Sequence, residues 1–431
     1  MKFIHTADLH IGQIIYQNYE RSDEHAHFFR QLEQWCRLEN PDALLVSGDV
    51  FDVQQPSAAT RKAYTEYFVE LHQACPNMRI IITAGNHDSP SRLETDSSLW
   101  KLANTTVVGL APTMDLARAE DGWQESFIVR LSTGYVIALP YMIGHRQEVL
   151  QRILDFVQAE NKQGLPVVMM AHLAVTGADP TGHNITVGNL QLCAVEELGS
   201  GYDYLALGHI HKPQTIGHPD DVDCPEVTYP AGIVRYSGSA LHVSCDERYP
   251  HTVSLVNIDW HGSEVTIKQL RIDELRHFYT LPRDGSAYPD EKQALEGIAQ
   301  FCQETGSGYF RLRMARRAVL SGNFNQQVYN LIEPYKEEVR YNPKISWDGE
   351  EITADNEESR PVFQVAELQQ MTDPLEFISR TADQYPDLDL EMVRDAFTEV
   401  LAEVARKEEE EQAKAKRGKK ATGTTEPSET I

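Results

Sequence analysis

Residues that can bind metal ions recur at one kind of position in this sequence, directly after short apolar segments. Asp, Asn and His follow five such segments, as Asp8-Leu9-His10, Gly48-Asp49-Val50-Phe51-Asp52, Gly85-Asn86-His87-Asp88, His172 and Gly208-His209-Ile210-His211. If these segments are strands of an α/β sheet, the polar residues lie at the carboxyl ends of the strands, where such sheets bind ligands. We therefore expect them to converge on one site, although they are far apart in the chain.

The combination of oxygen and imidazole ligands favours Mn²⁺, Fe²⁺ or Zn²⁺ over Ca²⁺ or Mg²⁺. There are enough ligands for two ions, and Asp49 is the natural bridging carboxylate because its strand should be central. Two ions about 3.5–4 Å apart can clamp a phosphate, generate a hydroxide and stabilise the leaving oxygen. His87, beside Asn86, can donate a proton to the leaving alkoxide or stabilise the developing charge.

Each motif is weak evidence by itself, because D-x-H or G-N-H-D after a strand is more often structural than metal-binding. All five in this order, each at the end of a predicted strand, are far harder to attribute to chance. We therefore interpret them as one catalytic metal centre.

The elements that would position these residues alternate between strands and helices. Short apolar runs of the buried-strand type occur at Phe3–Thr6, Ala43–Ser47, Arg79–Thr83, Tyr135–Leu139, Pro166–Ala171 and Tyr204–Leu207. Amphipathic helical patterns follow the first two. The chain becomes more β-like from Val227 to Ile272. Residues 1–272 are thus predicted to form a layered α/β domain.

A second unit is predicted to begin near Asp273, after which helical and strand patterns form a small α+β module over residues 273–347. Residues 348–372 are predicted to be a linker. Two short helices with apolar faces follow at 373–406, and the pattern fits packing on the main domain and docking onto a partner equally well. Residues 407–431 are polar and charged, and we expect a disordered tail.

Composition narrows the possible environments and partners. The N-terminus lacks a signal-peptide pattern and no apolar run is long enough to span a membrane, so we expect a cytoplasmic protein with no membrane contact. The six cysteines form no C-x-x-C pair, which argues against a zinc ribbon. The formal net charge of −26 lacks the basic excess of a protein that binds DNA unaided. Bound metal ions or a partner would have to supply positive charge.

The order D-x-H, G-D-x-x-D, G-N-H-D, H and G-H-x-H resembles the calcineurin-like metallophosphoesterase superfamily. The segments around Asp8, Asp49 and His209, with Tyr236-Ser237-Gly238-Ser239, are most similar to nuclease subunits of bacterial DNA-repair complexes. The likeness extends to about Leu270.

The resemblance implies a two-sheet sandwich flanked by helices, with a capping domain at 273–347 that helps to shape a DNA site. It implies one ion held by Asp8, His10, Asp49 and His211, and a second held by Asp49, Asn86, His172 and His209. It also implies His87 as the catalytic histidine and manganese as the usual activator. Residues 373–406 would bind an SMC-type coiled-coil ATPase, and a homodimer would form a heterotetramer with it.

Three functions are compatible with these features. The first is a metal-dependent DNA exonuclease and endonuclease that works with an ATPase in repair or recombination, and the additional modules favour it. The second is a metallophosphoesterase acting on a small phosphodiester or a phosphoprotein, which the acidic charge favours slightly. The third is a scaffold protein with a vestigial metal site. Lost ligands would be its signature, and none of the expected ligands is lost.

Overall fold

The computed structural model describes residues 1–348, apart from 17, 112–121, 143–146, 182–191, 220–223, 244–246 and 248. The chain divides into residues 1–356 and 357–431, and all described residues belong to the first unit. The predicted docking helices and tail, with nearly all of the predicted linker, lie outside the described residues. Within the described part, no helix is both long and apolar enough to cross a membrane.

The first sheet has seven strands, and its centre is built from segments that the sequence analysis predicted. In order, the strands are β12 (Glu226–Tyr229), β15 (Val265–Arg271), β14 (Thr252–Ile258), β1 (Lys2–Thr6), β4 (Ala43–Ser47), β5 (Arg79–Thr83) and β6 (Thr105–Val108). The last four run parallel, whereas β14 pairs antiparallel with β1. The carboxyl ends of β1, β4 and β5 are therefore neighbours.

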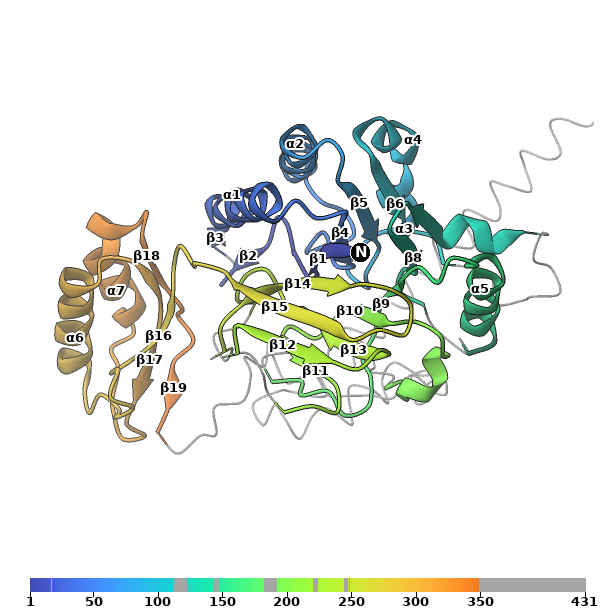
Figure 1. The fold of residues 1–431 in the computed structure, drawn as a ribbon. Coiled ribbons are helices and arrows are strands. Elements are labelled where there is room, and N and C mark those ends of the chain that lie inside the picture. The colour runs from blue at the N-terminus through green and yellow to red at the C-terminus, as the bar shows by residue number, and fades with distance from the viewer. Residues whose placement is uncertain are drawn as a thin grey trace, which may run out of the picture. The chain divides into compact units, whose positions relative to one another are not determined.

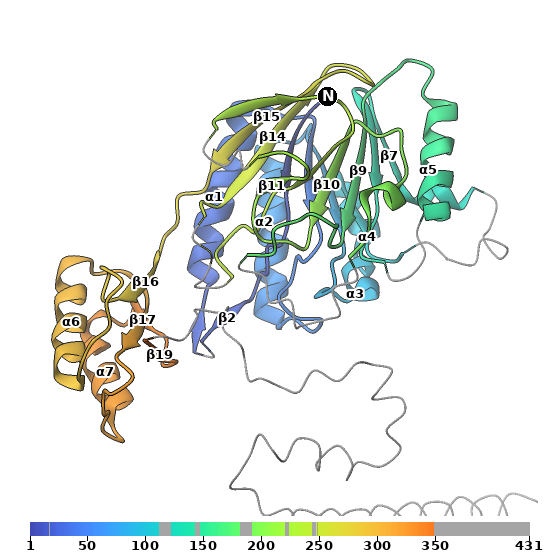
Figure 2. The ribbon, with the colours of Figure 1, turned by 90° about the horizontal axis from the view of Figure 1, so that it is seen from below.

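The second sheet has six strands, and two predicted strands lie next to each other at its centre. In order, the strands are β11 (Gln214–Thr215), β13 (Ile233–Tyr236), β10 (Tyr204–Gly208), β9 (Val167–His172), β8 (Gly134–Ala138) and β7 (Ile128–Leu131). Figure 2 shows β9 and β10 side by side, and their parallel register places Gly208 opposite His172. The two strands thus end at the same level.

The two sheets pack face to face and share one core. Phe3, Leu45 and Ile81 of the first sheet lie in the same buried cluster as Met169 and Leu205 of the second. The other face of the first sheet is covered by α1 (Ser22–Glu39) and α2 (Ala58–Ala74), and α5 (Gln147–Glu160) packs against the second sheet (Figure 1). Covering both faces explains why the central strands are almost wholly apolar. The predicted α/β sandwich flanked by helices is confirmed.

Local sequence accounts for the two long covering helices. α1 buries Phe28, Leu32 and Cys36, which are four residues apart and so form one stripe of the helix. It ends at Asn40, whose left-handed conformation lets its N–H bond to the carbonyl of Cys36. α2 begins at Ser57, whose side chain accepts a hydrogen bond from the N–H of Thr60.

The remaining elements of the sandwich are short. They are β2 (Ile14–Ile15), β3 (Tyr19–Glu20), α3 (Pro90–Glu94), α4 (Ser97–Trp100), and the 3-10 helices η1 (Lys101–Ala103), η2 (Trp123–Phe127) and η3 (Val195–Leu198).

Beyond the sandwich, a small module has its own hydrophobic core. It contains β16 (Phe278–Leu281), α6 (Glu291–Glu304), β17 (Gly308–Met314), α7 (Phe324–Ile332), η4 (Glu333–Tyr335), β18 (Val339–Tyr341) and β19 (Ser346–Trp347). Its strand pairs are parallel, with α6 and α7 as the crossovers. The module is tied to α1 by buried polar contacts, since the Tyr309 hydroxyl donates to the Glu24 carboxylate at 2.5 Å and Arg276 pairs with the same group at 3.3 Å.

Candidate metal centre

The strand ends of both sheets meet at one place because glycines let the backbones approach closely. A Cβ on Gly208 would lie 1.9 Å from the carbonyl oxygen of Ser47, and a Cβ on Gly85 would lie 2.1 Å from Oδ1 of Asp49. Both distances are far below any real contact. The ends of β4, β5 and β10 are thus in contact only because glycine occupies these two positions, and the residues that follow share one site.

The backbone of this site is strained. Asp8 (φ 51°), His10 (φ 44°), Asp49 (φ 47°) and His209 (φ 100°) adopt positive φ, and they make up four of the seven such non-glycine residues in the described chain. Conformations of this kind cost about 1–3 kcal/mol each and concentrate at functional sites, where the surrounding structure holds them. The concentration marks this site as the functional one.

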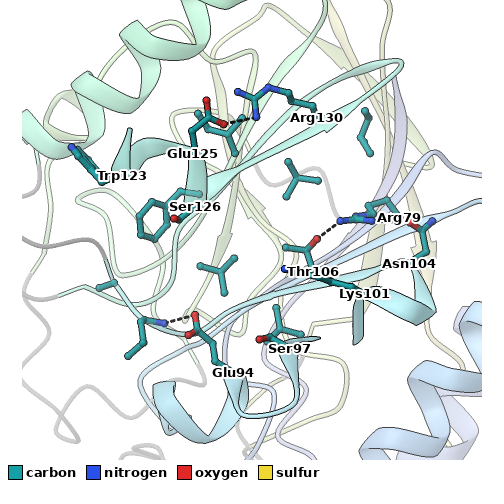
Figure 3. A pocket seen from close by; sticks show the side chains of 18 of the residues that line it. Arg79, Glu94, Ser97, Lys101, Asn104, Thr106, Trp123, Glu125, Ser126 and Arg130 are labelled. Carbon is teal, nitrogen blue, oxygen red and sulfur yellow. Dashed lines mark hydrogen bonds and ion pairs between the residues drawn. The ribbon is translucent and has the colours of Figure 1, made fainter. Parts of the chain in front are cut away.

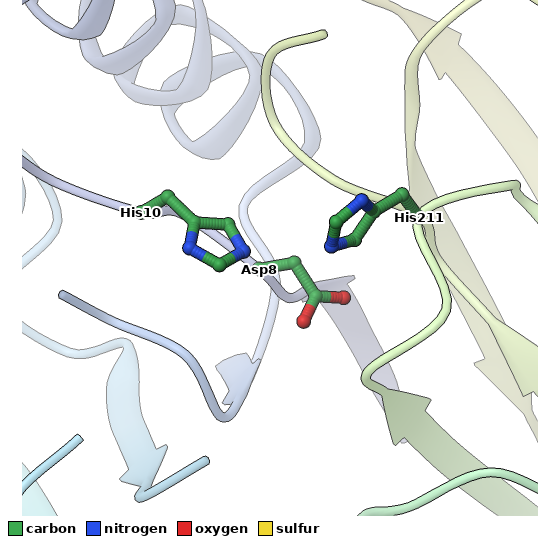
Figure 4. A group of neighbouring side chains, drawn as sticks. All are labelled: Asp8, His10 and His211. Carbon is green, nitrogen blue, oxygen red and sulfur yellow. The ribbon is translucent and has the colours of Figure 1, made fainter. Parts of the chain in front are cut away.

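A first group of possible ligands consists of Asp8, His10 and His211 (Figure 4). One ligand atom of each lies within 4.8 Å of those of the others, and all three residues are buried. Within the described structure, Nε2 of His10 is buried and has no hydrogen-bond partner. Because an unpaired buried polar atom is costly, this nitrogen fits a metal ligand.

A second group consists of Asp49, His172 and His209, whose ligand atoms also lie within 4.8 Å of one another. Asn86 joins it, because its Oδ1 lies 3.0 Å from Nε2 of His172 and 2.9 Å from Nδ1 of His209. Oδ2 of Asp49 is 3.3 Å from Nε2 of His172. The two groups adjoin, since Nδ1 of His172 lies 3.9 Å from Oδ1 of Asp8 in the first group.

His87 lies at the edge of these groups and is only half-buried. Its N–H donates a hydrogen bond to Oδ1 of Asp49 at 2.8 Å, and its Nδ1 lies 2.9 Å from the carbonyl oxygen of Asp52. Its ring packs edge-on against that of His10, with centroids 5.0 Å apart. A proton on Nδ1 satisfies the Asp52 carbonyl and leaves Nε2 as the nitrogen that can exchange a proton with a bound molecule.

Three buried histidines are held in the same way, with Nδ1 anchored and Nε2 available as a ligand. Nδ1 lies 2.8 Å from the Ser47 carbonyl oxygen in His172 and 3.3 Å from Oδ1 of Asp52 in His10. In His211 it lies 3.4 Å from Oε1 of Glu247. Metal-binding histidines commonly give their second N–H to a carboxylate or carbonyl, which fixes the tautomer and the ring.

The charge of the site also fits cations. Burial lowers the pKa of His10, but the hydrogen bond to Asp52 and the charge of Asp49 outweigh it and raise the pKa to about 9. Burial likewise lowers the pKa of His172, whereas the charge of Asp49 raises it to about 9. Burial alone raises the pKa of Asp8 above its usual range. Negative charge is therefore in excess here, and divalent ions would balance it.

Asp88 supports the site without belonging to either group. Its buried carboxylate accepts hydrogen bonds from the N–H groups of Gly85 (2.8 Å), Val50 (3.0 Å) and Phe51 (2.9 Å). It therefore ties together the loops that carry Asn86 and Asp49. The sequence motif contained Asp88 but gave no sign of this role, and nothing in the sequence singled out Glu247.

A third group of possible ligands, His242, His251 and Glu274, lies outside the motifs. Carboxylates already pair with both histidines, since Nδ1 of His242 is 3.1 Å from Glu274 and Nε2 of His251 is 3.1 Å from Glu247. These contacts satisfy the group without an ion.

The largest cavity lies elsewhere, between the edge strands β6 and β7 (Figure 3). Its lining includes Arg79, Lys101, Thr106 and Arg130, and none of the eight predicted site residues. Arg130 is already paired with Glu125 and Glu160, and Arg79 donates to Asn104 and Thr106. The cavity thus offers no comparable centre.

Comparisons with known proteins agree with this site. The sequence profile described as calcineurin-like phosphoesterase matches residues 1–213. The chain belongs to the calcineurin-like phosphoesterase family, as its motifs predicted, and it is a metal-dependent phosphodiesterase.

Within that family, the chain is similar to SbcD, one of the two components of SbcCD nucleases. SbcD of Escherichia coli (strain K12) is 30% identical over 332 residues, which cover 70% of this chain and 75% of that one. SbcD of Rhodobacter capsulatus is 29% identical over 350 residues, covering 74% and 80%. The DNA double-strand break repair protein Mre11 of Aeropyrum pernix is 28% identical over 254 residues, covering 56% and 57%.

Proposed function

We propose that this chain is a two-metal, manganese-dependent DNA exonuclease and endonuclease that acts in DNA repair or recombination. The observation that carries the proposal is the pair of adjoining ligand groups at the strand ends, one containing Asp8 and the other Asp49. The similarity to SbcD and Mre11, whose names describe a nuclease and a break-repair protein, supports DNA as the substrate.

In the proposed centre, Asp8, His10, Asp49 and His211 hold one ion, and Asp49, Asn86, His172 and His209 hold the other. The grouping of the side chains supports this division, with Asp49 as the shared carboxylate. When bound, the two ions would supply a clamp for the phosphate, activation of the attacking water and stabilisation of the leaving oxygen.

His87 has the proposed role of general acid. Its Nδ1 proton is held by the Asp52 carbonyl, so its Nε2 proton is the one that can pass to the leaving alkoxide. The N–H bond to Asp49 fixes the backbone of His87 against the second group. The ring is thus placed at the edge of the centre, where the bond to the leaving oxygen would break.

We further propose that residues 1–272 form the nuclease domain and that residues 273–347 form a cap that shapes the DNA site. The separate core of the cap and its contacts with Glu24 support this division. Residues 373–406, joined by the linker 348–372, are proposed to dock an SbcC-like SMC-type ATPase, while residues 407–431 remain a disordered tail. A homodimer of the chain would form a heterotetramer with this ATPase in the cytoplasm, on the nucleoid when bound to DNA. The net charge of −26 supports the need for such a partner.

Cleavage of linear double-stranded DNA with added Mn²⁺, compared between wild type and His87→Gln, tests the proposal. The wild type should degrade the DNA, and the variant should be slower by about 10²–10⁴-fold, the range for loss of a general acid. The variant should still bind Mn²⁺, because His87 is not among the proposed ligands.

The same comparison separates the alternative functions. Turnover of bis-p-nitrophenyl phosphate without any DNA cleavage, with and without the ATPase partner, would favour a small-phosphodiester substrate. Equal DNA cleavage by wild type and His87→Gln would contradict the role assigned to His87.

A further inference from the structure

A buried carboxylate lies directly behind the first ligand group. Glu247 follows β13 in the chain, and its side chain has no solvent exposure. Its Oε1 is 3.4 Å from Nδ1 of His211. The side chain therefore contacts a proposed metal ligand from the side opposite to the nitrogen that would bind the ion.

The carboxylate of Glu247 is held in place by its other oxygen. Oε2 accepts a hydrogen bond from the N–H of Val243 at 3.1 Å and lies 3.1 Å from Nε2 of His251, which is also fully buried. Nδ1 of His251 lies 2.9 Å from the carbonyl oxygen of Ser239. Protons on both nitrogens of His251 satisfy both contacts, and the positive ring then balances the buried charge of Glu247.

This fixed carboxylate selects the tautomer of His211. A proton on Nδ1 faces Oε1 of Glu247, so the lone pair of the neutral ring lies on Nε2, toward the first group. A carboxylate behind a histidine also makes the ring a better electron donor to an ion. His172 in the second group has the Ser47 carbonyl at the corresponding position, so the two groups differ in this support.

We propose that Glu247 is a positioning residue that sets the tautomer and orientation of His211, and thereby the affinity of the first ligand group for its ion. The inference rests on the proposed function, in which His211 is a metal ligand. Its specific consequence is asymmetry: losing Glu247 should weaken one ion site and spare the other.

Direct Mn²⁺ binding by the full chain tests this inference, with electron paramagnetic resonance of the free ion as the readout. Wild type should bind two ions. Glu247→Gln should still bind two, but with one affinity lowered by about 10–100-fold, the usual effect of losing such a partner. Its DNA cleavage should recover toward the wild-type rate at saturating Mn²⁺, because the ligands themselves remain.

Glu274→Gln is a matched control. Glu274 is a largely buried glutamate that pairs with His242 at 3.1 Å and with His277 at 2.8 Å, so its loss disturbs a similar contact elsewhere. Both Mn²⁺ affinities should match the wild type. Thermal unfolding of each variant reports any general loss of structure.

Two unchanged affinities in Glu247→Gln, or equal losses at both sites, would overturn the inference. If this variant does not fold, Glu247→Asp replaces it, with the same criteria, because the shorter side chain withdraws the carboxylate from His211 while keeping its charge. Wild type that binds no Mn²⁺ would instead contradict the proposed function, so the two failures are distinguishable.

Discussion

His5 is a buried histidine that lies near the metal centre in sequence but serves the fold. Its Nδ1 lies 2.9 Å from the hydroxyl of Tyr204, which joins β1 of the first sheet to β10 of the second. Burial, followed by the positive charge of Arg235, lowers the pKa of His5 to about 3. The ring is therefore neutral in the folded protein.

This histidine should make the fold sensitive to acid. The unfolded chain takes up a proton at His5 near its ordinary pKa of about 6.5, whereas the folded chain does so only near 3. Below about pH 6.5 the unfolded state binds more protons, so stability falls with pH, by up to about 1.4 kcal/mol per pH unit from this residue. Urea unfolding at about pH 7 and about pH 5 should show a smaller loss in His5→Gln than in wild type.

His218→Gln is the control for this measurement, because His218 is exposed. It should lose stability between the two pH values as wild type does. An identical pH dependence in His5→Gln and wild type would show that His5 does not carry the effect.

At the scale of secondary-structure elements, the meeting of β4 and β10 depends on a single glycine. An alanine Cβ at Gly208 would lie 1.9 Å from the carbonyl oxygen of Ser47, and a backbone atom cannot move aside as a flexible side chain can. Gly208→Ala should therefore destabilise the fold by about 1–3 kcal/mol or more, the cost of overpacking a tight core. It should also disturb His209 and weaken Mn²⁺ binding.

Gly322→Ala is the matched control, since no atom lies within 4 Å of the Cβ position of Gly322 and its φ is not positive. It should keep both stability and Mn²⁺ binding within about 0.5 kcal/mol of wild type. Equal unfolding midpoints for the two glycine variants would contradict the close approach of β4 and β10.

The sequence predicted the elements whose two faces are both buried, because such strands are continuously apolar. Ala43–Ser47 and Arg79–Thr83 coincide with β4 and β5, and Glu291–Glu304 coincides with α6. The strands β7 and β16 were not predicted. β7 is an edge strand that contains Arg130, and β16 stops at Pro282, so neither shows a long apolar run.

The same distinction applies to the candidate site. Its eight side chains could be predicted because they follow recognisable strands in short motifs, and the structure places them together. Glu247 could not be predicted, because only the three-dimensional path of the chain between β13 and β14 brings it behind His211. Residues that act through another side chain carry no local sequence pattern.

For the whole molecule, the charge balance sets the main demand on function. The chain has 65 acidic and 39 basic residues, and part of this negative charge is gathered at the proposed metal centre. Two divalent ions would neutralise only that part. The proposed ATPase would supply the remaining positive surface for DNA.

Deleting residues 373–431 tests this division of labour. The truncated chain should still hydrolyse bis-p-nitrophenyl phosphate with Mn²⁺ at the wild-type rate, because every proposed ligand and His87 lie before residue 212. It should no longer bind the coiled-coil ATPase in a pull-down. Unchanged complex formation would place the docking surface elsewhere on the chain, and loss of phosphodiesterase activity would show that the deleted segment supports the catalytic domain.

The most direct test of a two-ion centre is a crystal of the full chain soaked in Mn²⁺ and measured by anomalous scattering at the manganese edge. The account predicts two peaks about 3.5–4 Å apart. One should lie among Asp8, His10 and His211, the other among Asn86, His172 and His209, and Asp49 should contact both. Asp49→Ala should lose or weaken both peaks. A single peak, or two peaks away from these side chains, would contradict the two-metal assignment.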